Sequence, residues 1–161
     1  MLGKLTKKQL IQHDKKQTLF HEQGHSIVAS YFGVFGKVNL SRNPLGGIEE
    51  KFWIGSYTMY NDPTEVELPD EVKAVIKYML PPKNWKALIG MAGFVAEQIA
   101  NGETDGNKIS SSLEEAIEME EISHTDCAMI GEDWEWGDVD SVLKILLDRW
   151  DTVERFVNYH L

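Results

Sequence analysis

The chain has 161 residues, of which 42% are hydrophobic, and a formal net charge of −10. This length predicts a single domain spanning residues 1–161. The acidic excess argues against nonspecific nucleic-acid binding, so we expect no nucleic-acid partner. No apolar run is long enough to cross a bilayer, so we expect no membrane partner. With one cysteine, Cys127, the chain can form no intramolecular disulfide, and any metal site must use histidine and carboxylate ligands.

The N-terminal segment, residues 1–16, mixes lysine and glutamine with leucine and isoleucine. It lacks the continuous apolar stretch of a signal peptide, so we expect a cytoplasmic protein. The five lysines of this segment are interpreted as a solvated helix face rather than a binding patch. They are Lys4, Lys7, Lys8, Lys15 and Lys16.

The first half of the chain is predicted to form a long helix followed by two strands. Apolar residues recur at helical spacing over residues 5–33, and Gly33 is expected to end this helix. Alternating polar and apolar residues predict a short strand at 36–41, and aromatic and β-branched residues predict a second at 52–60. The proline and glycines at 43–47 indicate a loop, across which the two strands could pair.

The middle of the chain is predicted to contain two helices. Asp70 is expected to cap a helix that ends near Leu80, where two prolines follow. A well-formed amphipathic helix is predicted between Trp85 and Ile99. The glycine-containing segment 101–108 is expected to be a loop.

Two short helices are predicted from capping signals. Ser112 with Glu115, and Ser123 with Asp126, have the spacing of a capping box, in which the first side chain bonds the backbone of the third following residue. Each pair therefore predicts the start of a helix.

The C-terminal end is predicted to form one helix. Gly137 is expected to break the chain, and an apolar stripe then runs through residues 139–157. Together these elements predict an α+β fold that is mostly α-helical with a small β-sheet or hairpin.

A metal-binding motif lies inside the first predicted helix. Residues 21–25 read His-Glu-Gln-Gly-His, an H-E-x-x-H sequence with His21 and His25 one turn apart. Side chains at positions i and i+4 share one helix face, so both imidazoles could bind one zinc ion. Glu22, beside the first histidine, could take a proton from a water on that ion while the water attacks a carbonyl.

Two observations bear on how this motif is interpreted. Gly24 weakens the helix by roughly 1 kcal/mol relative to alanine, which suggests close packing or substrate access near the metal. The alternative to a metal site is an amphipathic helix whose two histidines are ordinary surface or core residues. The position of the motif in mid-helix favours the metal.

A stable catalytic site also needs a third protein ligand. Spacing alone does not choose among the candidates. They are His13, His124, His160, Glu97, Asp105, Asp126 and the pair Glu114 and Glu115. For Asp126 there is a clear alternative, because its spacing from Ser123 is also that of a capping box.

Several segments, in matching order, resemble those of a known family. Residues 20–29 match the family's H-E-A-G-H helix, with Gln23 in place of the usual alanine. Residues 37–40 and 55–58 resemble its two strands, and the second strand has a G-Y-T-like sequence. Residues 91–97 resemble its A-G-x-x-A-E helix, and Gly102 with Glu103 follows as in the family. From about Thr18 to Ile130 the chain thus resembles the peptidase domain of the FtsH-type ATP-dependent zinc proteases. It is more similar still to their small stand-alone relatives.

The resemblance implies a zincin-like domain whose third zinc ligand is an aspartate in a later helix. One alignment puts Ser112 at the position of this aspartate, which is a departure from the family. A second alignment, with residues 109–121 as an insertion, puts Asp126 there, as in the stand-alone relatives, and we expect Asp126 to be the ligand. We expect no counterpart of the family's ATPase module or membrane anchor. The expected substrate is therefore a peptide, an unfolded segment or a protein delivered by a partner.

Glu97 and the predicted strand at 52–60 can each be interpreted in two ways. Glu97, in the A-G-x-x-A-E segment, could orient a zinc-bound histidine or could be a partly exposed helix glutamate. The strand at 52–60 could offer an edge to an extended substrate or could simply form hairpin core.

The sequence therefore predicts a zinc-dependent peptidase in which His21, His25 and Asp126 bind Zn²⁺ and Glu22 is the general base. The expected substrate is a peptide or an unfolded protein, and self-association into a homo-oligomer stays open. The alternative function is a peptidase-derived, catalytically inactive binding or regulatory module, with zinc structural or absent. The displaced third ligand motivates that alternative.

Overall fold

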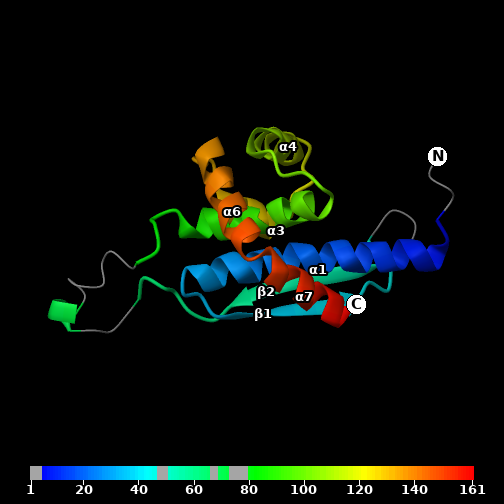
Figure 1. Cartoon of the computed structure of the whole chain (residues 1–161), viewed down its shortest axis with the longest axis horizontal. Coiled ribbons are helices and arrows are strands. Elements are labelled where there is room, and N and C mark those ends of the chain that lie inside the picture. The colour runs from blue at the N-terminus through cyan, green and yellow to red at the C-terminus, as the bar shows by residue number, and fades with distance from the viewer. Residues whose placement is uncertain (1–4, 47–50, 66–68, 73–79) are drawn as a thin grey trace.

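Figure 1 shows the computed structural model of the chain, which describes residues 5–46, 51–65, 69–72 and 80–161. The described part has an α+β fold that is mostly helical, with a two-stranded antiparallel sheet, which confirms the predicted mixture of helices and a small sheet. Among the described helices, none combines the length and the apolar character needed to cross a membrane.

The long helix α1 (Lys7–Tyr31) forms as predicted. It begins at Thr6, whose hydroxyl accepts from the Gln9 amide while the Gln9 side chain bonds the Thr6 amide. Beyond its end, Gly33 has φ +80°, a backbone conformation that glycine adopts without steric cost. The first half of α1 is mostly exposed and the second half is mostly buried, so the H-E-x-x-H motif lies inside the protein.

The two predicted strands are also confirmed. Strand β1 (Gly36–Arg42) pairs antiparallel with β2 (Trp53–Met59), with Val38 opposite Tyr57 and Leu40 opposite Gly55. Along β2, half-buried and exposed residues alternate, because successive side chains of a strand point to opposite faces. The hairpin lies alongside α1 in Figure 1, and both strands contact that helix.

Helix α3 (Trp85–Ala100) forms as predicted and packs against α1. The two backbones come very close, because a Cβ on Gly24 would lie 2.6 Å from the Ala92 carbonyl oxygen and 2.6 Å from the Ala96 Cβ. This confirms the close-packing interpretation of Gly24. Of the helix predicted at 70–80, residues 70–72 are helical, and 73–79 lie outside the described residues.

The prediction for the next helix is wrong. Helix α4 (Gly106–Glu118) begins within the segment expected to be a loop, six residues before Ser112, which lies in mid-helix. The physical reason is Asp105, whose carboxylate accepts from the Asn107 and Lys108 amides and so caps the helix. From that start, Ile109 begins a buried face at helical spacing.

Helix α5 (His124–Ile130) begins where the capping signal predicts. The Ser123 hydroxyl accepts a hydrogen bond from the Asp126 amide at 3.2 Å. The Asp126 side chain points elsewhere, as described below.

The single final helix is also a wrong prediction, since two helices are present, α6 (Trp136–Asp148) and α7 (Trp150–His160). Gly137 lies inside α6, because Glu135 and Asp138 form a capping box that starts the helix just before it. The actual break is at Arg149, whose guanidinium lies 4.6 Å from the centre of the Tyr31 ring. The break lets α7 turn back and pack against α1.

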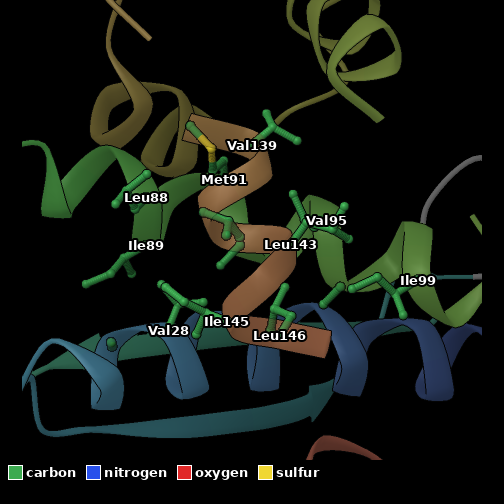
Figure 2. Packing of buried hydrophobic residues seen from close by; sticks show 14 of the residues in the cluster. Val28, Leu88, Ile89, Met91, Val95, Ile99, Val139, Leu143, Ile145 and Leu146 are labelled. Atoms are coloured by element: carbon green, nitrogen blue, oxygen red, sulfur yellow. The ribbon is translucent and has the colours of Figure 1, made fainter. Parts of the chain in front are cut away.

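The hydrophobic core lies between α1, α3 and α6, and Figure 2 shows α6 crossing α3 above α1. Branched aliphatic side chains fill this space, and several are completely inaccessible to solvent. They include Val28, Val95, Val139, Val142 and Leu146. This packing fixes α3 on α1 and thereby sets the positions of the polar side chains at their interface.

We predict that the start of α4 is set by Asp105. Asp105→Ala should lower the free energy of unfolding by about 1 kcal/mol, because two helix N–H groups lose their acceptor. Ser112→Ala, the matched control, should change it by less than about 0.5 kcal/mol. Urea denaturation followed by circular dichroism measures both, and an equal or larger loss in the Ser112 variant would contradict this helix start.

Candidate metal centre

Three helices meet at the H-E-x-x-H motif. Helix α1 contributes His21, Glu22 and His25, α3 contributes Glu97, and α5 contributes Asp126, which is 105 residues from His21 along the chain. His21, His25 and Asp126 form a group whose donor atoms all lie within 4.8 Å of one another. The structure thus brings together the three residues that the sequence predicts as ligands.

The donor atoms of this group are close enough to share one ion. His21 Nε2 lies 3.1 Å from His25 Nε2 and 3.0 Å from Asp126 Oδ2, and His25 Nε2 lies 3.3 Å from the same oxygen. In a tetrahedral zinc site, ligand bonds of about 2.0–2.2 Å place neighbouring donors roughly 3.3–3.6 Å apart, so the three donors here are at or slightly inside that separation. Two imidazoles and a carboxylate are donors that zinc accepts, and such a set leaves a fourth position open.

The remaining ring nitrogens fix the orientation of both histidines. His21 Nδ1 donates to Glu97 Oε2 at 2.9 Å, and His25 Nδ1 donates to the Ile89 carbonyl oxygen at 2.6 Å. When each ring is neutral, its hydrogen therefore sits on Nδ1, and Nε2 is available to bind a metal. Hydrogen bonds of this kind orient metal-binding histidines and raise their basicity. Glu97 fits both interpretations in part, because it bonds His21 while 22% of its side chain stays exposed.

A glycine on α3 leaves room beside the donor atoms. A Cβ on Gly93 would lie 2.5 Å from His21 Nε2 and 2.6 Å from His25 Nε2, too close for any real contact. An α-helix does not require glycine here, and glycine is less favourable than alanine in a helix by about 1 kcal/mol. The space beside the two nitrogens therefore exists because residue 93 has no side chain.

The electrostatics of the group favour a cation at its centre. Burial acts to lower the pKa of His21, but hydrogen bonds to Asp126 and Glu97 outweigh it and raise that pKa to about 10. Burial acts to raise the pKa of Asp126, but hydrogen bonds with His21 and His25 hold it well below its usual range. A carboxylate and two ring nitrogens facing one another need a shared positive charge, which is a proton or a metal ion.

Glu22 is buried beside the group, with 7% of its surface exposed. Burial raises its pKa, and the opposing attraction of His21 and His25 only partly offsets this. Within the described residues, its carboxylate accepts no hydrogen bond from the protein, so it is free to accept one from water.

The other candidate ligands lie elsewhere. His13, His124 and His160 are exposed, and in the described ranges none of them joins the group. Asp105 caps α4, and Glu114 accepts a hydrogen bond from the Trp136 indole at 2.5 Å. Glu115 and Ser112 also belong to α4, away from the motif.

Sequence reasoning assigned no role to Ile89 or Gly93. The Ile89 contact is made by a backbone carbonyl, which every residue carries, so no sequence signal could have identified it. Gly93 does carry a signal, because it is a glycine in the middle of a strongly amphipathic helix, where glycine often marks close packing.

No protein-family model matches the chain, and no curated protein matches it. The resemblance to the FtsH-type peptidases therefore stays a prediction that rests on the sequence segments themselves.

We predict that Gly93→Ala abolishes metal binding. The added Cβ would occupy the space beside both Nε2 atoms, while alanine should favour the helix itself. Gly137→Ala is the matched control, because a Cβ there would meet no atom within 4 Å. Zinc content and zinc affinity measure the effect, and a Gly93 variant that binds zinc as tightly as wild type would contradict a metal at this position.

Proposed function

We propose that this protein is a zinc-dependent peptidase with a zincin-like domain, in which His21, His25 and Asp126 bind zinc and Glu22 is the general base. The observation that carries the proposal is the convergence of three metal-binding side chains beside a buried glutamate. Bound zinc would lower the pKa of a water molecule toward neutrality and polarise a peptide carbonyl.

The proposed role of Glu22 is to move a proton. Its carboxylate accepts a proton from the attacking water and later delivers it to the departing amine. Burial raises the pKa of Glu22, which makes it a better base than an exposed glutamate. General acid–base catalysis of this kind contributes about 10²–10⁴-fold to a rate.

Glu97 supports the proposed reaction without touching the substrate. Its bond to His21 Nδ1 keeps the ring turned so that Nε2 faces Asp126 and His25. The Ile89 carbonyl does the same for His25. Both histidines are thereby held in place before a metal arrives, which reduces the cost of binding it.

The proposed substrate is an extended peptide or an unfolded protein segment. Among the described strands, β2 pairs with β1 alone. On its other edge the Trp53 amide donates to Asp14, and the backbone groups beyond Trp53 could pair with an added strand. On the face of β2 toward α1, the Tyr57 ring stacks on His25 with ring centres 6.5 Å apart. A peptide on this edge would therefore pass close to the metal ligands.

A binding or regulatory module without activity is the second candidate. One observation favours it, because His21 hydrogen-bonds to the carboxylates of both Asp126 and Glu97. A protonated His21 would be balanced by these two groups, so the cluster could be stable with no metal at all.

We predict about one zinc per chain and a strong dependence on Asp126. Asp126→Ala should lower zinc affinity far more than Ser112→Ala or Glu97→Ala, because it removes a ligand atom, whereas Glu97 acts through His21. Competition with a chromophoric chelator measures these affinities. If the Asp126 variant only loses stability and binds zinc normally, Asp126 is a helix residue and not a ligand.

We predict that Glu22→Gln keeps the zinc and loses peptide hydrolysis, because an amide cannot accept the proton. Cleavage of a broad panel of unfolded substrates, with zinc content measured on the same samples, tests this. Equal activity in both proteins, or none in zinc-loaded wild type, would contradict the peptidase and favour the inactive module.

A further inference from the structure

The face of β2 toward α1 has a large–small–large pattern of side chains. At Trp53 the backbone amide donates to Asp14 Oδ2 at 2.9 Å, and at Tyr57 the ring stacks on His25. Strand β2 and helix α1 therefore run side by side in the same direction. Gly55 lies between the two aromatic residues, level with Glu22.

The backbone of Gly55 is pressed against the side chain of Glu22. A Cβ at this position would lie 2.6 Å from Glu22 Cγ, 2.6 Å from Thr18 Cγ2 and 3.1 Å from Glu22 Oε1. Gly55 is not among the described glycines with positive φ, so its backbone conformation does not require glycine. Glycine inside a strand is unfavourable and often marks a close approach. The close approach to Glu22 is the reason for glycine here.

Packing is the main restraint on the Glu22 side chain. Its carboxylate has no hydrogen-bond partner in the described part of the protein, and a glutamate has several rotatable bonds. Contact with β2 at Gly55 limits the directions that the side chain can take.

We propose that Gly55 is a positioning residue that seats Glu22 and directs its carboxylate toward the metal centre. Its catalytic consequence rests on the proposed peptidase function. Beyond Trp53, whose amide is bonded to Asp14, the other edge of the same strand could pair with an extended peptide. Strand β2 would therefore contact both Glu22 and the bound peptide, and the scissile bond would lie level with Gly55.

Crystal structures of wild type and Gly55→Ala, both without metal, test the seating directly. Contacts between carbon atoms are normally about 3.5–4.0 Å, so the added methyl should displace Glu22 by roughly 1 Å. The His21 and His25 rings should stay in place, since neither approaches Gly55 in the way that Glu22 does. An unmoved Glu22 would overturn the proposal, whether or not the protein is a peptidase.

Kinetics test the consequence. Gly55→Ala should keep full zinc content and wild-type KM within about twofold, and should lower kcat by roughly 100-fold, as expected for a displacement of about 1 Å. Loss of zinc together with activity would show a general structural defect and would contradict a positioning role. Wild-type kcat in the variant would contradict it as well.

A second substitution distinguishes a displaced Glu22 from a general folding defect in the Gly55→Ala variant. Thr18→Ser removes the Cγ2 that the new methyl would meet and retains the hydroxyl that donates to the Asp14 carbonyl. Adding it to Gly55→Ala should restore part of kcat and return Glu22 toward its wild-type position, and no recovery of either would count against the proposal. Gly137→Ala, in open space, should leave both unchanged. If zinc-loaded wild type cleaves nothing, the peptidase proposal fails, and the crystal structures still decide the role of Gly55.

Discussion

His21 Nε2, His25 Nε2 and Asp126 Oδ2 face one another at 3.0–3.3 Å, and all three atoms carry lone pairs. Such an arrangement is repulsive unless a positive charge lies among the donors, and that charge is either a proton or a metal ion. The hydrogen bonds from His21 and His25 to Glu97 and Ile89 occupy both Nδ1 atoms and so leave Nε2 for the shared charge. The surrounding helices are arranged to hold these side chains at this separation.

Small residues make this arrangement sterically feasible. Gly24 lets α1 approach α3, and Gly93 leaves the space next to the histidines. Gly90 lets α3 approach α5, because a Cβ added at Gly90 would lie only 3.2 Å from the Asp126 carbonyl oxygen. A short aspartate on α5 can therefore reach imidazoles on α1. Each of these glycines weakens its helix, and the packed aliphatic core of α1, α3 and α6 offsets that cost.

The parts of the fold and site that sequence reasoning predicts are those with local signals. The pairing of His21 with His25 follows from helical spacing, and the hairpin follows from strand alternation around a loop. The start of α4 was missed because two local signals competed, and the carboxylate cap at Asp105 prevailed over the Ser112 spacing. The break at Arg149 depends on how α7 packs on α1, which is a tertiary effect with no local signal.

Asp126 shows why the proposed third ligand could not be chosen from spacing. The two interpretations of this residue, helix cap partner and ligand, are compatible in the structure. Its backbone amide donates to Ser123, while its carboxylate lies beside both histidines. Only the packing of α5 on α3 decides where that carboxylate points, and Gly90 and Gly93 are the residues that permit it.

An anomalous-scattering map at the zinc edge, from crystals of the purified protein, decides whether the three side chains bind zinc. If His21, His25 and Asp126 bind zinc, one strong peak lies about 2.0–2.2 Å from His21 Nε2, His25 Nε2 and Asp126 Oδ2. A map with no peak among these atoms from crystals grown with excess zinc, or a peak that excludes Asp126, would contradict this set of ligands.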